Sequence, residues 1–225
     1  MKKNLSYIFG DGYSLKSNKG FTLAEVLITL GIIGVVSAMT IPTLMTNYQD
    51  KAYTTQLHKV YNELQQAMLQ VMTEKNAVNL KEAGINSSTA AQNLIKKSFK
   101  VVTSCETSLT PCLGTSYRYS GSDTGSTALT GYSGAVYVLA SGSAISPVYD
   151  NSGSAQKVLN VLVDVNGPKA PNIIGKDAYF MAVYNDGSID TYNESASSIP
   201  LSQSERSSAG KDWKPFGEIL NNNWK

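Results

Sequence analysis

An apolar stretch near the N-terminus constrains this chain more than any other feature. Residues Phe21 to Met45 read FTLAEVLITLGIIGVVSAMTIPTLM, and these 25 residues include a single charged side chain, Glu25. A helix rises about 1.5 Å per residue, so the run exceeds the roughly 20 residues that cross the ~30 Å hydrocarbon layer of a bilayer. A secretory signal peptide has a shorter apolar core, about 7–15 residues, followed by a cleavage site of small residues. We therefore predict a membrane-spanning helix over residues 21–45.

Positive charge precedes this run and indicates its orientation. Residues 1–20 hold one acid and four lysines: Asp11, Lys2, Lys3, Lys16 and Lys19. Lysines beside a span stay on the cytoplasmic side of the membrane. We therefore expect a single-pass protein whose C-terminal portion lies outside the cytoplasm.

Glu25 is an unusual residue for the start of such a run. A charged side chain at the centre of a membrane helix costs about 2.5–3.5 kcal/mol on insertion scales, and less near the interface. A residue of this kind is a candidate for function and calls for a partner. The presence of Glu25 argues against the alternative, a plain signal anchor.

Residues 19–25, KGFTLAE, resemble the prepilin cleavage and methylation motif of type IV pilins and type II secretion pseudopilins. The resemblance implies that a membrane peptidase removes a leader, residues 1–20, by cutting between Gly20 and Phe21. It also implies that the new N-terminal residue, Phe21, is N-methylated. Glu25 then becomes the fifth residue of the mature chain.

The resemblance extends to two helix-weakening residues. Gly34 matches the family's mid-helix glycine and Pro42 its helix-kinking proline. Both weaken a helix locally, which suits a helix that must leave lipid and bend inside a filament. The alternative is that both residues are simply more common in membrane helices.

Cleavage would place a positive amine close to a carboxylate in an apolar helix. In a filament, the Glu25 carboxylate of one subunit could instead meet the Phe21 amine of a neighbour. The attraction is strong where the dielectric constant is low, and an unpaired charge there is costly. Such a pair would set the axial register between subunits.

The resemblance implies a structural subunit of a type IV pilus or type II secretion pseudopilus, not an enzyme. Its implied partners are other pilin or pseudopilin subunits, the prepilin peptidase, an inner-membrane assembly platform and membrane lipid. The implied location is the bacterial inner membrane and then an extracellular or periplasmic filament. Three alternatives stay open: a minor pseudopilin of a secretion or DNA-uptake machine, a membrane-anchored extracytoplasmic binding module that does not polymerise, and a carboxylate-only hydrolase.

A helical pattern continues beyond the apolar run. Apolar residues recur at steps of three and four: Tyr53, Leu57, Val60, Leu64, Met68 and Val71. This spacing predicts one long helix over residues 21–75, with an amphipathic second half, 46–75. His58 lies off the centre of the stripe, so we expect it on the solvated surface of the helix.

Residues 76–225 are expected to form an α+β head outside the cytoplasm. A short helix is predicted over residues 89–99. Alternating patterns and turn residues predict about four antiparallel strands, within residues 135–140, 144–148, 158–165, 178–184 and 188–192. The fold class is therefore α+β and pilin-like: a long N-terminal helix, membrane-spanning in its first half, packed on a small antiparallel sheet.

Cys105 and Cys112 bracket the sequence ETSLTP. A head that is moved across the membrane enters an oxidising compartment, where disulfides persist. We therefore expect a disulfide that closes a small loop, the alternative being two free thiols.

The most patterned part of the head is residues 163–180, VDVNGPKAPNIIGKDAYF. Asp164, Asn166 and Asp177 supply side-chain oxygens, which calcium prefers as ligands, and some pseudopilins and minor pilins bind calcium in their heads. The alternative is a structural loop in which these side chains bond their own backbone. No other cofactor is expected.

Composition excludes several other functions. The net charge is +2, but without residues 1–20 the chain has 15 basic and 16 acidic residues, so no nucleic-acid contact is inferred. One histidine and two cysteines argue against a Cys/His zinc site and against any His-centred catalytic triad not built on His58.

Overall fold

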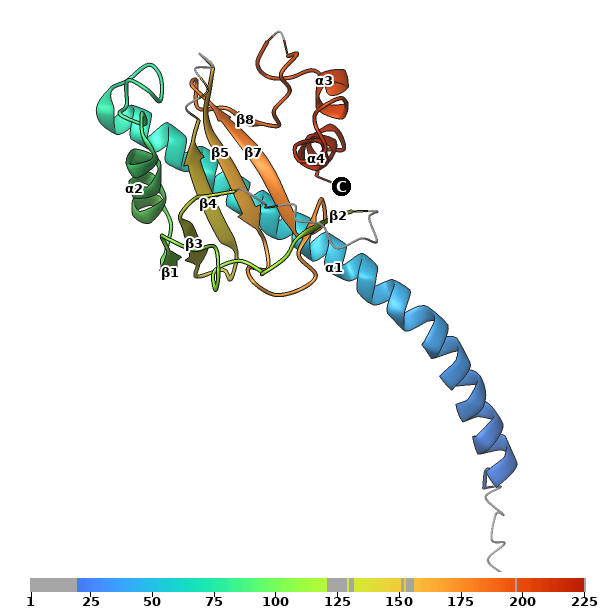
Figure 1. Ribbon diagram of the computed structural model, residues 1–225. Coiled ribbons are helices and arrows are strands. Elements are labelled where there is room, and N and C mark those ends of the chain that lie inside the picture. Colours follow the sequence, from blue (N-terminus) through green and yellow to red (C-terminus); the bar gives the residue numbers. More distant parts are fainter. Residues whose placement is uncertain are drawn as a thin grey trace, which may run out of the picture. The chain divides into compact units, whose positions relative to one another are not determined.

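The computed structural model describes residues 20–120, 129, 132–150, 152, 156–196 and 198–224. The chain divides into two compact units, an N-terminal unit that ends at Thr46 and a C-terminal unit, Asn47–Lys225, which we describe separately. Helix α1, Leu23–Lys75, contributes its first half to one unit and its second half to the other (Figure 1). The predicted long helix is confirmed and begins two residues later than expected. Of the predicted leader, all but Gly20 lies outside the described residues.

The C-terminal unit is α+β. Its described residues form helices α2 (Ser88–Ser98), α3 (Gln203–Ser207) and α4 (Lys214–Asn221), and strands β1 (Val101–Cys105), β2 (Arg118–Tyr119), β3 (Val136–Leu139), β4 (Ala144–Tyr149), β5 (Lys157–Asp164), β6 (Ile173–Ile174), β7 (Ala178–Tyr184) and β8 (Ile189–Asp190). The strands form one sheet in the order β1-β3-β4-β5-β7-β6-β2, with β8 paired to β7. The central strands β5 and β7 are buried along nearly their whole length.

The sheet is larger than predicted, and it is mixed instead of antiparallel. Strand β6 runs parallel to both β7 and β2, while the pairs among β1, β3, β4, β5, β7 and β8 are antiparallel. Strands β2 and β6 have two residues each, too few for an alternating apolar pattern to show in the sequence. Strand β1 is largely exposed, so its sequence also lacks the alternation of a half-buried strand.

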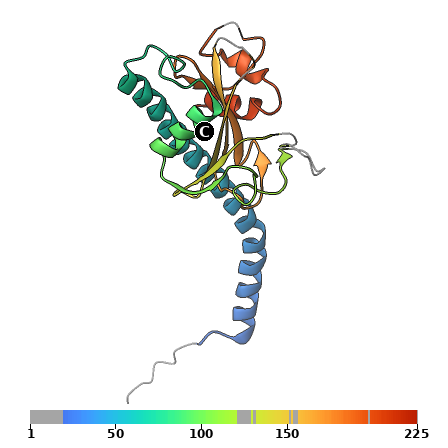
Figure 2. The same cartoon turned by 60° about the vertical axis from the view of Figure 1, so that its left-hand side comes forward.

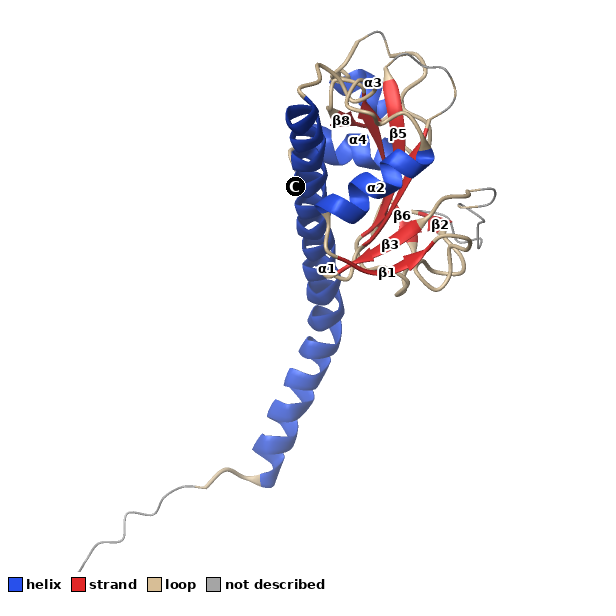
Figure 3. Cartoon of the chain, turned by 90° about the vertical axis from the view of Figure 1, so that its left-hand side faces the viewer, coloured by secondary structure: helices blue, strands red, loops and turns tan. Residues whose placement is uncertain are grey.

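Helices cover one face of the sheet. The second half of α1 buries Leu57, Val60, Leu64 and Met68 in a core shared with α2, α4 and the strands. Figures 2 and 3 show α1 and α2 on the same side of the strands. The predicted apolar stripe of α1 is therefore confirmed, because its residues at steps of three and four all contact this core.

His58 is predicted to lie on the solvated surface of the helix, and the structure corrects this prediction. It is half-buried and stacks on Trp224, with the ring centroids 4.2 Å apart. Trp224 follows α4 in a left-handed backbone conformation, φ 61°, and reaches α1 from the end of the chain. The amphipathic pattern of α1 could not show this contact, because the partner lies more than 160 residues away in the sequence.

Loops cover the other face. Residues between β1 and β3 pack Leu113 and Tyr117 onto it, and the segment after β8 adds Leu201. The predicted disulfide is present: Cys105, at the end of β1, is bonded to Cys112, with Cα atoms 6.1 Å apart. It ties the start of this covering loop to the edge of the sheet.

Replacing Leu64 by Ala tests the packing of α1 on the sheet. Leu64 is fully buried, so the variant should lose roughly 2–5 kcal/mol of unfolding free energy through lost transfer energy and a residual cavity. Leu69→Ala, on the same helix but 54% exposed, should change it by no more than about 0.5 kcal/mol. Urea unfolding of the detergent-solubilised chain, followed by circular dichroism, measures both. Equal losses would contradict this packing.

Candidate functional site

The predicted cleavage point lies in exposed backbone ahead of α1. Gly20 and Phe21 precede the helix, and the Phe21 side chain is 88% exposed. No helical hydrogen bond would have to break for a peptidase to reach the bond between them. Cleavage and methylation at these residues stay predictions, but the geometry leaves the bond accessible.

Thr22 and Glu25 form a capping box at the start of α1. The Thr22 backbone N–H and hydroxyl both donate to Glu25 Oε2, at 2.8 Å each, and the Glu25 backbone N–H donates to Thr22 Oγ1 at 3.2 Å. These bonds satisfy backbone donors that the first turn of any helix leaves unpaired. The spacing Thr-x-x-Glu in the sequence is the signature of such a box, and the sequence analysis missed it.

Glu25 therefore already has a local partner. Both Thr22 bonds go to one carboxylate oxygen, Oε2. In the described residues, no Lys, Arg or His side chain pairs with Glu25. A charge partner for this carboxylate must therefore come from outside those residues.

The apolar half of α1 buries almost nothing within its own unit. Among residues 20–46, all side chains but Ser37 are exposed. Three threonines there bond their own helix: Thr29 to the Glu25 carbonyl, Thr40 to that of Val36 and Thr46 to that of Pro42, at 2.9–3.0 Å. Their hydroxyls therefore need no water, which suits an apolar environment. By length and composition, α1 is the one helix in the described part of the chain that could cross a membrane.

Gly34 and Pro42 both lie inside α1. A Cβ placed on Gly34 would meet no atom within 4 Å, so the chain's own packing does not require glycine there. Pro42 has no N–H, so it leaves one carbonyl of the preceding turn without its helical partner. No contact among the described residues explains either residue, and flexibility at these points stays a prediction.

A second candidate site is the loop between β5 and β7. The buried Asp164 accepts hydrogen bonds from the Tyr117 hydroxyl and, at 3.1 Å, from the Asn166 backbone. The buried Asp177 accepts from the backbone N–H groups of Asn172 at 2.8 Å and Ile173 at 2.5 Å. The loop thus uses both carboxylates to organise its own backbone.

Burial shifts the titration of these acids. Removal from water, and to a smaller extent repulsion from Asp177, raises the pKa of Asp164 to about 7 against the opposing hydrogen bond from Tyr117. Burial also raises the pKa of Asp177, although its backbone donors oppose the shift. Two buried acids that repel each other favour at least one proton on the pair near neutral pH.

The predicted calcium ligands come together only in part. The Asn166 amide nitrogen donates to the Ala170 carbonyl at 3.1 Å, while its Oδ1 is buried without a partner among the described residues, as a free ligand would be. However, all four oxygens of Asp164 and Asp177 already accept protein hydrogen bonds. Within the described residues, no group of three His, Cys, Asp or Glu side chains could hold a metal ion. The geometry favours the structural loop, and calcium stays a prediction.

Comparison with known proteins bears on the first site. Residues 15–41 match the family described as the prokaryotic N-terminal methylation motif, the signature of type IV pilins and pseudopilins. This match confirms the resemblance on residues 19–25 and includes Gly20, Phe21 and Glu25. Neither the curated proteins nor the solved structures gave a match to this chain.

The raised pKa of Asp164 predicts how stability changes with pH. An acid with a folded-state pKa near 7 and an ordinary value of 3.8 binds its proton more tightly in the folded chain. Its contribution to stability is therefore complete below about pH 4 and is lost as pH rises through 7. In EDTA, the wild type should lose unfolding free energy between about pH 5 and pH 8 relative to Asp164→Asn.

The control for this measurement is Asp186→Asn, which removes an acid from an exposed turn. It should keep the pH dependence of the wild type in urea denaturation. A wild-type profile that matches Asp164→Asn would contradict the raised pKa. A separate measurement with excess calcium at about pH 8 tests for a calcium site. Such a site would raise the denaturation midpoint of the wild type but not that of Asp164→Asn.

Proposed function

We propose that this chain, which carries the N-terminal methylation motif of type IV pilins and pseudopilins, is a structural subunit of a helical filament. The prepilin peptidase would cut between Gly20 and Phe21 and methylate Phe21. The motif points to a processed subunit, not to an enzyme. The large C-terminal unit, with about 150 residues after α1, is compatible with a major pilin or a minor pseudopilin.

One observation carries this proposal: the apolar half of α1 is exposed in its own unit. Exposed apolar surface costs about 25 cal/mol per Å² relative to burial, so this half requires lipid or other protein around it. Before assembly the environment would be the bilayer. In the filament it would be the same helix of neighbouring subunits, which replaces lipid contacts by packing contacts.

Glu25 would then fix how the helices align. Cleavage creates an amine at Phe21, and an ion pair at 4 Å is worth about 4 kcal/mol at an effective dielectric of about 20. Because both Thr22 bonds use Oε2, an amine can approach Oε1 without breaking the capping box. Thr22 would therefore position the carboxylate, and the amine of a neighbouring subunit would neutralise it.

The same proposal sets the location and partners. Lysines before the span keep the N-terminus cytoplasmic, so the C-terminal unit would lie outside the cytoplasm. The disulfide between Cys105 and Cys112 suits an oxidising compartment of that kind. An inner-membrane assembly platform, lipid and other pilin or pseudopilin subunits would be the partners. The alternative is an anchored binding module that is processed but does not polymerise.

Glu25→Gln tests the assembly step most sharply. Glutamine is nearly isosteric and its Oε1 can still accept the two Thr22 bonds, so the helix should start normally and insert into the membrane. Loss of the charge removes the ion pair, and we expect the filament fraction to fall at least about 10-fold, equivalent to about 1.4 kcal/mol. Immunoblots of sheared filaments against membranes measure this ratio.

The matched control is Glu63→Gln, an exposed acid on the second half of the same helix, paired with Lys59 at 3.9 Å. It should assemble as the wild type does, since an exposed pair contributes little. Normal filaments from Glu25→Gln would refute the register argument. A wild-type chain that stays in the membrane fraction of cells that assemble pilus or pseudopilus filaments would favour the anchored module.

A further inference from the structure

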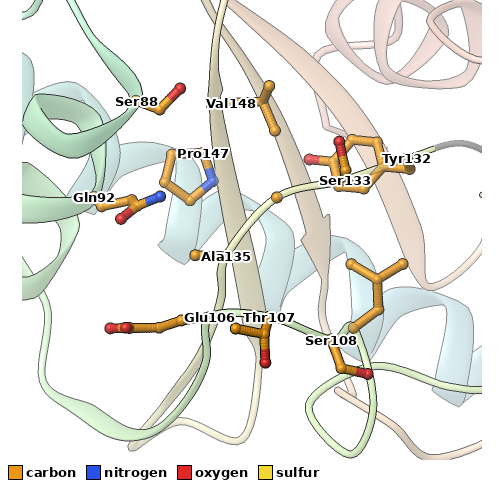
Figure 4. A pocket seen from close by; sticks show the side chains of 12 residues that line it. Ser88, Gln92, Glu106, Thr107, Ser108, Tyr132, Ser133, Ala135, Pro147 and Val148 are labelled. Carbon is orange, nitrogen blue, oxygen red and sulfur yellow. The ribbon is translucent and has the colours of Figure 1, made fainter.

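A hollow of about 350 Å³ lies beside β4, and its lining residues belong neither to the N-terminal motif nor to the Asp164 loop. The start of α2, the loop after β1 and the residues leading into β3 form its walls. Its lining residues are Ser88, Gln92, Glu106, Thr107, Ser108, Leu109, Tyr132, Ser133, Gly134, Ala135, Pro147 and Val148. Figure 4 shows Gln92 and Glu106 on one side of Ala135 and Pro147, with Tyr132 and Ser133 on the other.

Pro147 explains why the pairing of β3 with β4 ends here. Strands β3 and β4 pair only at Val138 with Ala144 and at Tyr137 with Ile145. Pro147, two residues further along β4, has no N–H to continue that ladder. The regular pairing of β3 with β4 therefore ends before Pro147, and the hollow lies beside this point, with the start of α2 in its wall.

Two close contacts shape the walls. A Cβ on Gly134 would come within 2.7 Å of Val148 Cγ2 and 2.9 Å of Ser146 Oγ, so glycine allows the chain to lie against β4. The disulfide between Cys105 and Cys112 closes the loop that carries Glu106, Thr107, Ser108 and Leu109. One covalent constraint and one packing constraint thus act on the walls of the hollow.

The lining excludes two classes of ligand. Among the described residues, no Lys, Arg or His side chain lines it, and the nearby Lys96 ammonium is already paired with its one acid, Glu106, at 2.7 Å, so an anionic ligand would have to displace Glu106 to reach a cation. An extended peptide would need free main-chain groups. Here the Ala135 carbonyl accepts from Ser146 Oγ at 2.8 Å, the Ser146 carbonyl accepts from the Tyr132 hydroxyl at 3.1 Å, and Pro147 has no donor.

What the hollow offers is hydroxyl, amide and carboxylate groups around a ring surface. Serine and threonine hydroxyls and the Gln92 amide can donate and accept, while Glu106 accepts. The Tyr132 ring and Pro147 supply apolar surface. These groups match a ligand whose edge carries hydroxyls and whose faces carry C–H groups. The volume lies at the lower end of the ~300–1,000 Å³ typical of small-molecule sites.

From these groups we infer that the hollow binds a neutral carbohydrate of one or two sugar rings. The Gln92 amide and the Glu106 carboxylate bind ring hydroxyls, and Tyr132 and Pro147 contact the ring face. This site does not depend on filament formation, because every lining residue belongs to the C-terminal unit of one chain.

Saturation-transfer NMR on the full chain tests the inference. The chain is held in lipid nanodiscs, because sugar-based detergents would compete with the disaccharides for the hollow. The probes are lactose, maltose and cellobiose, with sialyllactose as the charged counterpart and a Ser/Gly tetrapeptide as the peptide. At least one neutral disaccharide should receive transfer. Gln92→Ala should raise the dissociation constant of that disaccharide about 5-fold, which is the loss expected from one hydrogen bond. Gln203 is exposed on α3, so the control variant Gln203→Ala should leave the dissociation constant unchanged.

Absence of transfer to all three neutral disaccharides would overturn the inference. Transfer that Gln92→Ala leaves unchanged would overturn it as well, because binding would then lie elsewhere. Equal binding of sialyllactose at this site would contradict the exclusion of anions, and binding of the tetrapeptide alone would assign the hollow to peptides. The denaturation midpoint of Gln92→Ala, which should equal that of the wild type, separates lost binding from lost folding.

Discussion

The apolar half of α1 is exposed in its own unit, and the proposed function of the chain follows from this one constraint. Nearly all side chains of residues 20–46 are exposed, and most of them are apolar. The hydrophobic effect therefore requires an outside environment, which a bilayer and then a bundle of identical helices can supply in turn. Several polar groups of this half are satisfied locally: three threonines bond their own helix, and Thr22 binds the carboxylate of Glu25. Among the described residues, the charge of Glu25 has no Lys, Arg or His partner.

The second half of α1, unlike the first, buries its apolar residues within its own unit. From Leu57 onward its apolar stripe is buried against the sheet, α2 and α4, so the C-terminal unit has its own core. The sheet's other face is closed by a disulfide-bonded loop and by the segment after β8, where Arg206 donates two hydrogen bonds to the buried Asp190 at 2.8–2.9 Å. One helix thus links a surface that needs partners to a unit that folds around its own core. That unit leaves a hollow at Pro147, where the pairing of β3 with β4 ends.

Strong local patterns were read correctly from the sequence, while long-range contacts were not. The length of α1, the helix near residues 88–98, the disulfide and the longer strands follow from apolar periodicity, cysteine spacing and turn residues. The two-residue strands β2 and β6 escaped prediction because their pairing depends on loops that bring them together. The stacking of His58 on Trp224 was not predicted either, because the two residues are far apart in the sequence. At the N-terminus, the motif was recognised, but the capping bonds between Thr22 and Glu25 were overlooked although Thr-x-x-Glu signals them.

The mass of the N-terminal peptide, from protein isolated in its native membrane fraction, tests the central claim most directly. The account predicts a chain that begins at Phe21 and carries one added methyl group, because Gly20 and Phe21 lie exposed ahead of α1 within the methylation motif. Such a terminus supplies the amine that Glu25 is proposed to meet in a neighbouring subunit. A chain that still carries residues 1–20, in cells whose prepilin peptidase is active, would contradict the account and leave an anchored, unprocessed protein in its place.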